Sequence, residues 1–221
     1  MALLCWVLPM KFLVDTSAKT LGTLTSDLVA GQLLTPLTNY ANAGGVFAMD
    51  NGAFSGFKRK PFFRMLERNL EHEERCLFLT VPDIVGNAKL TTELYYQFTK
   101  ETEMLPWANK WAMVAQDGIE DLTINWWGVR TLFIGGTTEF KDSNACYDVV
   151  KAAKILDIPV HVGRVNTYKR YRVFADLGAD TCDGSGIAKF SHMLKDIETS
   201  VNRKASPDTQ ADLFTEGVCG V

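Results

Sequence analysis

Short apolar runs that end in a glycine or a functional polar residue recur along this chain of 221 residues. The four clearest runs span residues 111–118, 131–136, 160–164 and 179–184. In each run, an apolar stretch typical of a strand is followed at once by residues that can contact a ligand. When parallel strands close into a barrel, groups from several strand ends meet around one substrate. The runs therefore predict a barrel whose rim carries the functional site.

Stretches with apolar residues at helical spacing separate the expected strands. The expected helices span residues 62–72, 90–104, 143–156 and 168–177. The expected strands are Phe12–Val14, Gly45–Met49, Cys76–Val81, Lys110–Ala115, Thr131–Ile134, Pro159–Val162 and Asp180–Cys182, with a candidate eighth before Met10. Alternating strands and helices indicate a parallel sheet, either open or closed. Seven or eight such units, with no glycine-rich phosphate turn after the first strand, favour a compact (β/α)8 TIM-like barrel of the α/β class.

The composition is that of one domain with a large core, because 47% of the residues are hydrophobic and 22% are charged. We expect residues 1–200 to form a single β/α barrel catalytic domain. Residues 201–221 are expected to form a polar C-terminal tail. The apolar stretch 2–14 is too short to span a bilayer and predicts a first strand, although residues 1–9 are also a candidate for a loosely ordered extension.

Charge and cysteine usage narrow the function classes. The formal net charge of −3 provides no overall positive field for nucleic acid, so any such binding must rely on a local patch. The five cysteines are scattered, with no Cys-x-x-Cys pair and no Cys/His cluster at zinc spacing. This pattern favours a reducing, cytoplasmic compartment over a disulfide framework, and it predicts no metal site. With the apolar stretch 2–14 too short to span a bilayer, no membrane contact is expected either.

Three aspartates at three expected strand ends are the main catalytic candidates. Asp183 ends the last strand and precedes a glycine-rich turn, where it could be a covalent nucleophile, a general base or the N-cap of a helix. Asp50 and Asp83 follow two earlier strands. Because three such carboxylates exceed what helix capping alone would require, together they favour catalysis.

Other groups at the same strand ends could bind a base. Gln116 carries an amide that can read a purine edge, or it belongs to an ordinary turn. Gly135 and Gly136 expose backbone amides that suit oxygen-bearing ligand groups. Phe54, Phe57 and Trp111 are either stacking surfaces or plain core. His161 lies inside an apolar strand, where a packed core histidine is favoured over a ligand.

Six ordered motifs in the chain are similar to those of the tRNA-guanine transglycosylase superfamily. They span Ala48–Phe54, Val81–Val85, Val114–Gly118, Leu132–Glu139, His161–Arg164 and Gly178–Asp183. Each motif is weak alone, but their order makes the set specific. The residues of these motifs most resemble those of the small DNA-directed members, the 7-deazaguanine DNA transglycosylases of phages and genomic islands. The resemblance extends from about residue 15 to about residue 186.

The resemblance implies a role for each matched position. Asp183 would be the nucleophile that forms a covalent glycosyl-enzyme intermediate, and Asp50 would be the general acid/base. Asp83 and Gln116 would hydrogen-bond the purine edge. The remaining substrate-binding candidates are Phe54, the backbone groups of Gly135 and Gly136, and the pocket floor at Val162 and Gly163.

One departure from the family concerns zinc. The tRNA enzymes carry a Cys-x-Cys-x-x-Cys and distant His site after the nucleophile, whereas after Asp183 this chain has only His192 and Cys219. We therefore expect no zinc subdomain, which makes DNA a better candidate than tRNA. Lys58, Arg59 and Arg164 lie near expected rim loops and are candidates for contacts with the nucleic-acid backbone, or are solvated charges.

The leading hypothesis is a DNA-guanine transglycosylase that replaces guanine in DNA with a 7-deazaguanine base such as preQ0 or preQ1. It would need no cofactor, and would act in the cytoplasm, that of the host if the gene is phage-borne. An accessory protein or a homo-oligomer is a candidate partner. Two alternatives stay open: a hydrolase of N-glycosidic bonds that uses the same aspartates, and a non-catalytic purine-binding partner subunit. Retention of both Asp50 and Asp183 argues against the second, because binding alone needs no carboxylate beneath the sugar.

Overall fold

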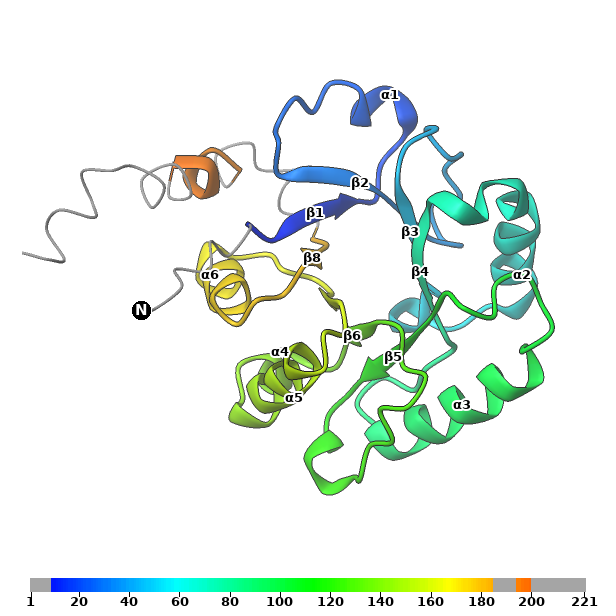
Figure 1. Cartoon of the computed structure of the whole chain (residues 1–221). Helices are drawn as coiled ribbons and strands as arrows, with labels where there is room; N and C mark the ends of the chain where they lie inside the picture. The colour runs from blue at the N-terminus through cyan, green and yellow to red at the C-terminus, as the bar shows by residue number, and fades with distance from the viewer. Residues whose placement is uncertain (1–8, 185–193, 200–221) are drawn as a thin grey trace, which may run out of the picture.

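The strands form a closed parallel barrel in the computed structural model, which describes residues 9–184 and 194–199 (Figure 1). Each strand pairs in parallel with the next along the chain, and β8 returns to pair with β1. Within the described residues the strands are β1 Lys11–Val14, β2 Val29–Leu34, β3 Phe47–Met49, β4 Cys76–Thr80, β5 Trp111–Ala115, β6 Leu132–Ile134, β7 Val160–Val162 and β8 Thr181–Cys182. The predicted compact TIM-like barrel is confirmed.

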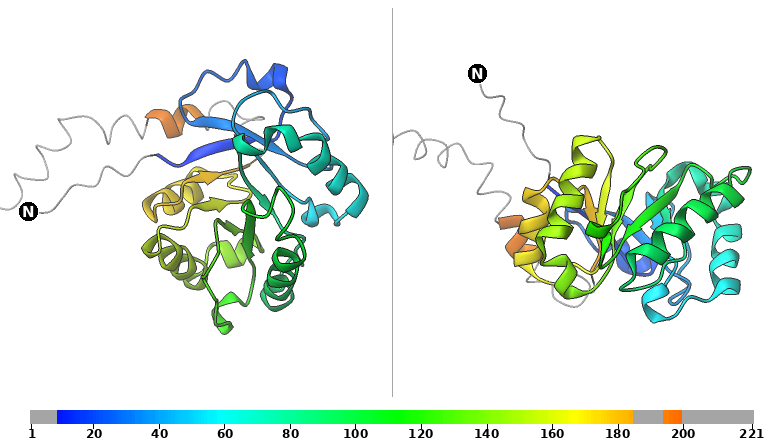
Figure 2. Two further views of the ribbon diagram at one scale, coloured as in Figure 1. Left: turned by 45° about the vertical axis from the view of Figure 1, so that its right-hand side comes forward. Right: turned by 90° about the horizontal axis from the view of Figure 1, so that it is seen from below.

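Helices surround the strands on the outside of the barrel (Figure 2). In the described ranges they are α1 Ala18–Leu21, α2 Arg59–Arg68, α3 Ala88–Glu101, α4 Thr138–Lys141, α5 Asn144–Ile155 and α6 Tyr168–Asp176, with 3-10 turns η1 Ala53–Ser55, η2 Leu70–Arg75 and η3 Ile119–Asp121. Side-chain caps start three of the longer helices: Asn87 accepts from Leu90 N, Ser143 from Cys146 N and Thr167 from Arg170 N. Four of these helices match the helical periodicity of the sequence.

One strand of the barrel, β2 at Val29–Leu34, was not predicted from the sequence. The candidate position before Met10 falls on residues 1–8, outside those that the structure describes. Gly31 and Gln32 interrupt the apolar pattern of β2, and each has a structural reason to be there. A Cβ at Gly31 would overlap the carbonyl of Val46 on the next strand segment. Gln32 is 1% exposed, with its amide donating to two backbone carbonyls and its oxygen accepting from Ala43 N. Gly31 therefore allows close approach to the next strand, and Gln32 joins β2 to the neighbouring loops by hydrogen bonds.

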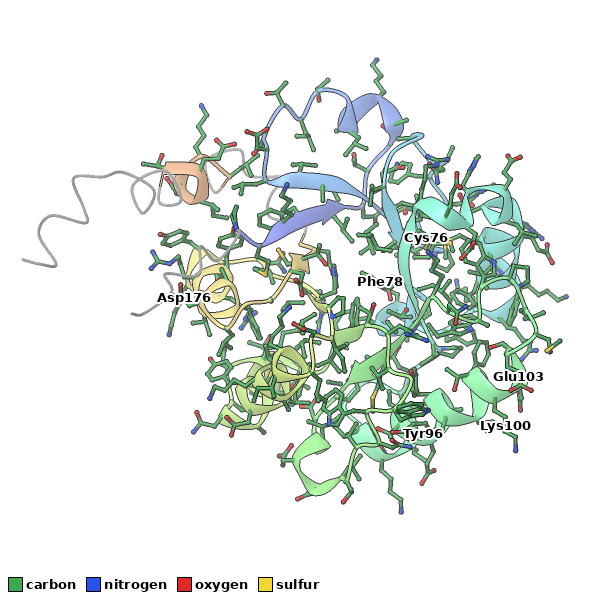
Figure 3. The ribbon with its side chains drawn as sticks, in the orientation of Figure 1. Cys76, Phe78, Tyr96, Lys100, Glu103 and Asp176 are labelled. Carbon is green, nitrogen blue, oxygen red and sulfur yellow. The ribbon has the colours of Figure 1, made fainter. Side chains whose placement is uncertain are left out.

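Aromatic side chains fill the barrel and its contacts with the helices. Trp111 is buried and packs edge-to-face against Phe98 of α3, with ring centroids 4.8 Å apart, so it belongs to the core and does not line the pocket at the strand ends. Phe57 is partly exposed and contacts Phe62 of α2. Phe78 points into the middle of the ring of strands (Figure 3), where it meets Phe133. The floor beneath the rim is thus apolar and closely packed.

Residues 194–199 form a further helical turn in which Ile197 is fully buried against the core. The predicted tail 201–221, the start of the chain at 1–8, and the positions of His192 and Cys219 lie outside the described residues. Among the described helices, none is both long and apolar enough to cross a membrane.

Candidate active site

The carboxyl ends of the strands bring most of the predicted site residues into one pocket. Its lining consists of Asp50, Ala53, Phe54, Asp83, Val85, Gln116, Phe133, Gly135, Gly136, Lys141, Gly163, Arg164 and Asp183. The space between them is about 440 Å³, including its open mouth. Both predicted catalytic aspartates, and all the predicted substrate-binding residues except Val162, line it. Carboxylate, amide, cationic and apolar groups from several strand ends therefore meet around one space at the rim of the barrel.

Asp183 is held at the end of β8 by a histidine ring nitrogen and a backbone N–H group. His161 Nε2 lies 3.1 Å from its Oδ2, and the backbone N–H of Arg164 donates to its Oδ1 at 3.0 Å. Its own backbone is fixed as well, since Asp183 N donates to Val162 O and Val165 N donates to Asp183 O. Its side chain is 16% exposed and faces the pocket. The carboxylate is therefore fixed in one orientation while it remains accessible.

Asp50 lies in a different environment at the end of β3. Thr80 donates to its Oδ1 at 3.1 Å. Burial, and after it the negative charges of Asp183 and Asp83, raise its pKa from 3.8 to about 7 against the lowering effect of its hydrogen bonds. A carboxyl with this pKa can both give and take a proton near neutral pH. Asp15, at the end of β1, also has a raised pKa, chiefly through burial and with a contribution from Asp183.

Asp83 is flanked by two side-chain amides. Asn51 Nδ2 donates to its Oδ1 at 2.7 Å, and Gln116 Nε2 donates to its Oδ2 at 2.6 Å. Burial raises the pKa of Asp83, against the lowering effect of these two bonds. The amide of Gln116 is oriented from the other end, because its Oε1 accepts from Gly86 N at 2.9 Å. The two predicted base-reading residues thus form one fixed polar array.

Asn51 is a site residue that the sequence reasoning passed over. It is 1% exposed, and its Nδ2 also donates to Val81 O at 2.5 Å while its Oδ1 accepts from Ala53 N at 2.6 Å. These bonds tie the loop after β3 to the loop after β4, and so set the spacing between Asp50 and Asp83. The signal was its place directly after Asp50 in a short motif ending at Phe54.

Two of the predicted glycines lie so close to neighbouring side chains that any larger residue would clash with them. A Cβ at Gly135 would lie 2.8 Å from Gln116 Nε2, and one at Gly163 would lie 2.9 Å from the ring of Phe133. Gly135 N donates to Ala115 O. Among the hydrogen bonds of the described residues, the Gly135 carbonyl and the Gly136 amide have no partner. These two backbone groups can therefore meet a ligand.

Two cations lie on the side of the pocket next to Gly136. Lys141 is 1% exposed and donates to Gly136 O at 3.2 Å; burial and the charge of Arg164 lower its pKa to about 8. Arg164 also donates to Gly136 O and stacks over Phe54, with its guanidinium carbon 3.9 Å from the ring centroid. Arg164 adopts a left-handed backbone with φ 58°, which directs its N–H toward Asp183.

Three predicted residues lie outside the pocket. Val162 is fully buried below it, where its carbonyl accepts from Asp183 N. Lys58 and Arg59 are exposed at the start of α2, which follows the loop after β3. Arg59 lies over the ring of Phe63 at 5.0 Å. These two cations follow the loop that carries Phe54 and are not part of the pocket lining.

The predicted packed histidine, His161, is fully buried, and it also contacts Asp183. The sequence reasoning found its burial but missed this contact. The described residues contain no group of three His, Cys, Asp or Glu side chains that could hold a metal ion. In comparisons with known proteins, no family model matches the chain, and no curated protein matches it.

Proposed function

We propose that this protein is a DNA-guanine transglycosylase, which exchanges guanine in DNA for a 7-deazaguanine base such as preQ0 or preQ1. One observation carries the proposal: two aspartates line the same pocket in contrasting environments. Asp183 is fixed by the His161 ring nitrogen and the Arg164 backbone N–H, whereas burial and neighbouring charge raise the pKa of Asp50 to about 7. Base exchange needs one carboxylate that stays ionised and one carboxyl that passes a proton.

In the first step, a carboxylate oxygen of Asp183 attacks C1′ of the target nucleotide. The C1′–N9 bond breaks, and its electron pair leaves with guanine, which takes a proton from Asp50. The product is a deoxyribosyl ester on Asp183 and a free guanine. Phe133 and Val85 line the pocket and limit the access of water to this ester.

In the second step, the incoming 7-deazaguanine replaces guanine. Asp50, now ionised, removes the proton from N9 of the new base, and N9 attacks C1′ as the ester bond to Asp183 breaks. Two displacements retain the configuration at C1′, and Asp50 ends as it began. The proton balance therefore closes without an added acid or base.

The polar array explains why both bases would fit. Guanine and 7-deazaguanine share the N1–H and N2–H donors and the O6 acceptor. Asp83 offers carboxylate oxygens to the donors, and Gln116 Nε2 and the Gly136 amide offer N–H groups to the acceptor. The pocket would therefore recognise the edge that the leaving and entering bases have in common.

The rim supplies cations for the DNA strand. Arg164 lines the pocket, and Lys58 and Arg59 are exposed beside it, so phosphates on either side of the target would meet positive charge. The pocket admits a single base, so a base in a duplex would have to be flipped out of the stack. The expected cytoplasmic location, and a partner protein or second copy, belong to this proposal as well.

The test is incorporation of radiolabelled guanine into DNA duplexes, single-stranded DNA and tRNA. We expect the label to enter DNA with the wild-type chain, and no label to enter with Asp183→Ala. Asp148→Asn is the matched control, because Asp148 is an exposed carboxylate on α5 paired with Lys151. Release of base without incorporation would favour the hydrolase. Absence of reaction on every nucleic acid would contradict catalysis and favour the purine-binding role.

A further inference from the structure

His161 is the one ring nitrogen donor beside Asp183 within the described residues, and it lies inside the barrel. Its side chain is fully buried between two phenyl rings, with Phe78 and Phe133 each at 4.9 Å between centroids. The Phe133 ring stacks nearly parallel to the imidazole, at 25°. This sandwich fixes the plane of the imidazole and keeps water away from it.

Both nitrogens of the ring have partners. Nδ1 lies 2.9 Å from Thr181 Oγ1, and Nε2 lies 3.1 Å from Asp183 Oδ2. The partners meet because His161 of β7 and Thr181 of β8 are register neighbours, and Asp183 follows two residues later. A chain of hydrogen bonds thus runs from Thr181 through the imidazole to the carboxylate.

The hydrogens of this chain follow from the chemistry of its ends. An ionised carboxylate only accepts hydrogen bonds, so Nε2 must carry a hydrogen if Asp183 is ionised. In a neutral imidazole Nδ1 is then an acceptor, and the Thr181 hydroxyl donates to it. The carboxylate therefore selects the Nε2–H tautomer, and the Thr181 hydroxyl satisfies Nδ1 by donating to it.

We infer that His161 is a positioning residue for Asp183, which it holds by an Nε2–H bond while the Thr181 hydroxyl satisfies Nδ1. With Arg164 N–H on the other oxygen, this bond fixes the carboxylate in one orientation for attack. The inference rests on the proposed function for its kinetic consequence. Its structural part, the hydrogen on Nε2, stands on the hydrogen-bond geometry and is tested without turnover.

The structural test is a long-range 15N–1H NMR experiment on the ring nitrogens of the uniformly labelled chain near neutral pH. His161 is assigned by the loss of its signals in His161→Phe. We expect a hydrogen-bearing Nε2 in the wild type, in Thr181→Ser and in Thr181→Val, with the Nδ1 signal displaced only in Thr181→Val, where Nδ1 loses the hydroxyl donor. Partly exposed His72 provides the solvated reference. A His161 ring that carries its hydrogen on Nδ1 alone would overturn the inference.

The kinetic test compares the same variants in guanine exchange. Because a hydrogen bond to a charged group is lost, we expect His161→Phe to lower kcat by about 10- to 100-fold, with KM changed less than about twofold. Thr181→Val should lower kcat less, and Thr181→Ser should restore it. Wild-type kcat in both His161→Phe and Thr181→Val would overturn the positioning role. Absence of exchange by the wild type would instead count against the proposed function, and the NMR result would still decide the tautomer.

Discussion

The raised pKa of Asp50 makes a quantitative prediction about stability. Its pKa rises from 3.8 to about 7 on folding, chiefly through burial and secondarily through the charge of Asp183. Between these values the unfolded chain has lost this proton and the folded protein still holds it. The free energy of unfolding therefore falls as the pH rises through this window, and it is flat with respect to Asp50 above it.

The magnitude follows from the size of the shift. At about 1.4 kcal/mol for each pH unit between 3.8 and about 7, the upper limit is about 4 kcal/mol. Because the carboxyl opens onto the pocket, solvent screening reduces this figure. As the pH rises from 5 to 8, we expect the ionisation of Asp50 to lower the free energy of unfolding by about 2 kcal/mol.

Asp50→Asn tests this value, because asparagine keeps the shape of the side chain and an oxygen that can accept from Thr80. From pH 5 to pH 8, the free energy of unfolding measured in urea should fall by about 2 kcal/mol more in the wild type than in the variant. At pH 8 the variant should be the more stable of the two. Equal pH dependence in the two proteins would refute the burial and charge coupling that define the acid/base candidate.

Three other predictions follow from the geometry. Gly135→Ala places a methyl group 2.8 Å from Gln116 Nε2, so thermal unfolding should show a loss of about 1–3 kcal/mol, and titration calorimetry should show weaker guanine binding; unchanged binding would argue against this wall of the pocket. Phe54→Ala removes a ring that is 64% exposed beneath Arg164, so the free energy of unfolding should change by less than about 1 kcal/mol while the affinity for DNA falls. Fluorescence anisotropy measures this affinity, and an affinity equal to that of the wild type would remove Phe54 from the site. Burial raises the pKa of three thiols, so peptide mapping after treatment of the folded protein with iodoacetamide at pH 8 should find them unmodified, and rapid labelling would contradict their packing; these are Cys76, Cys146 and Cys182.

The repeated strand ends were readable from the sequence because each combines two local signals. An apolar run buried on both faces is followed by glycine or a polar residue, as at Phe133 to Gly136 and at Val160 to Arg164. In a closed parallel barrel all such ends fall on one rim, so a correct fold places the residues together. For this reason Asp50, Asp83 and Asp183 could be grouped before their positions were known.

The parts that could not be predicted depend on contacts between distant segments. The strand Val29–Leu34 contains Gln32, which is buried only because loops fold over it and accept its hydrogen bonds. Likewise, nothing near Lys141 in the sequence shows that its side chain is buried and that its ammonium group turns inward to Gly136 O. The contact of His161 with Asp183 arises from the register of two neighbouring strands, which is a property of the closed barrel.

The central claim is that Asp183 bonds covalently to the sugar of the target nucleotide. The direct measurement is mass spectrometry of the chain after it has been incubated with a guanine-containing DNA oligonucleotide and then denatured, with no free nucleobase added at any stage. We predict a protein–DNA adduct whose peptide map places the deoxyribosyl ester on Asp183, and which Asp183→Ala does not form. An adduct on another residue, or an undiminished adduct in Asp183→Ala, would contradict the account.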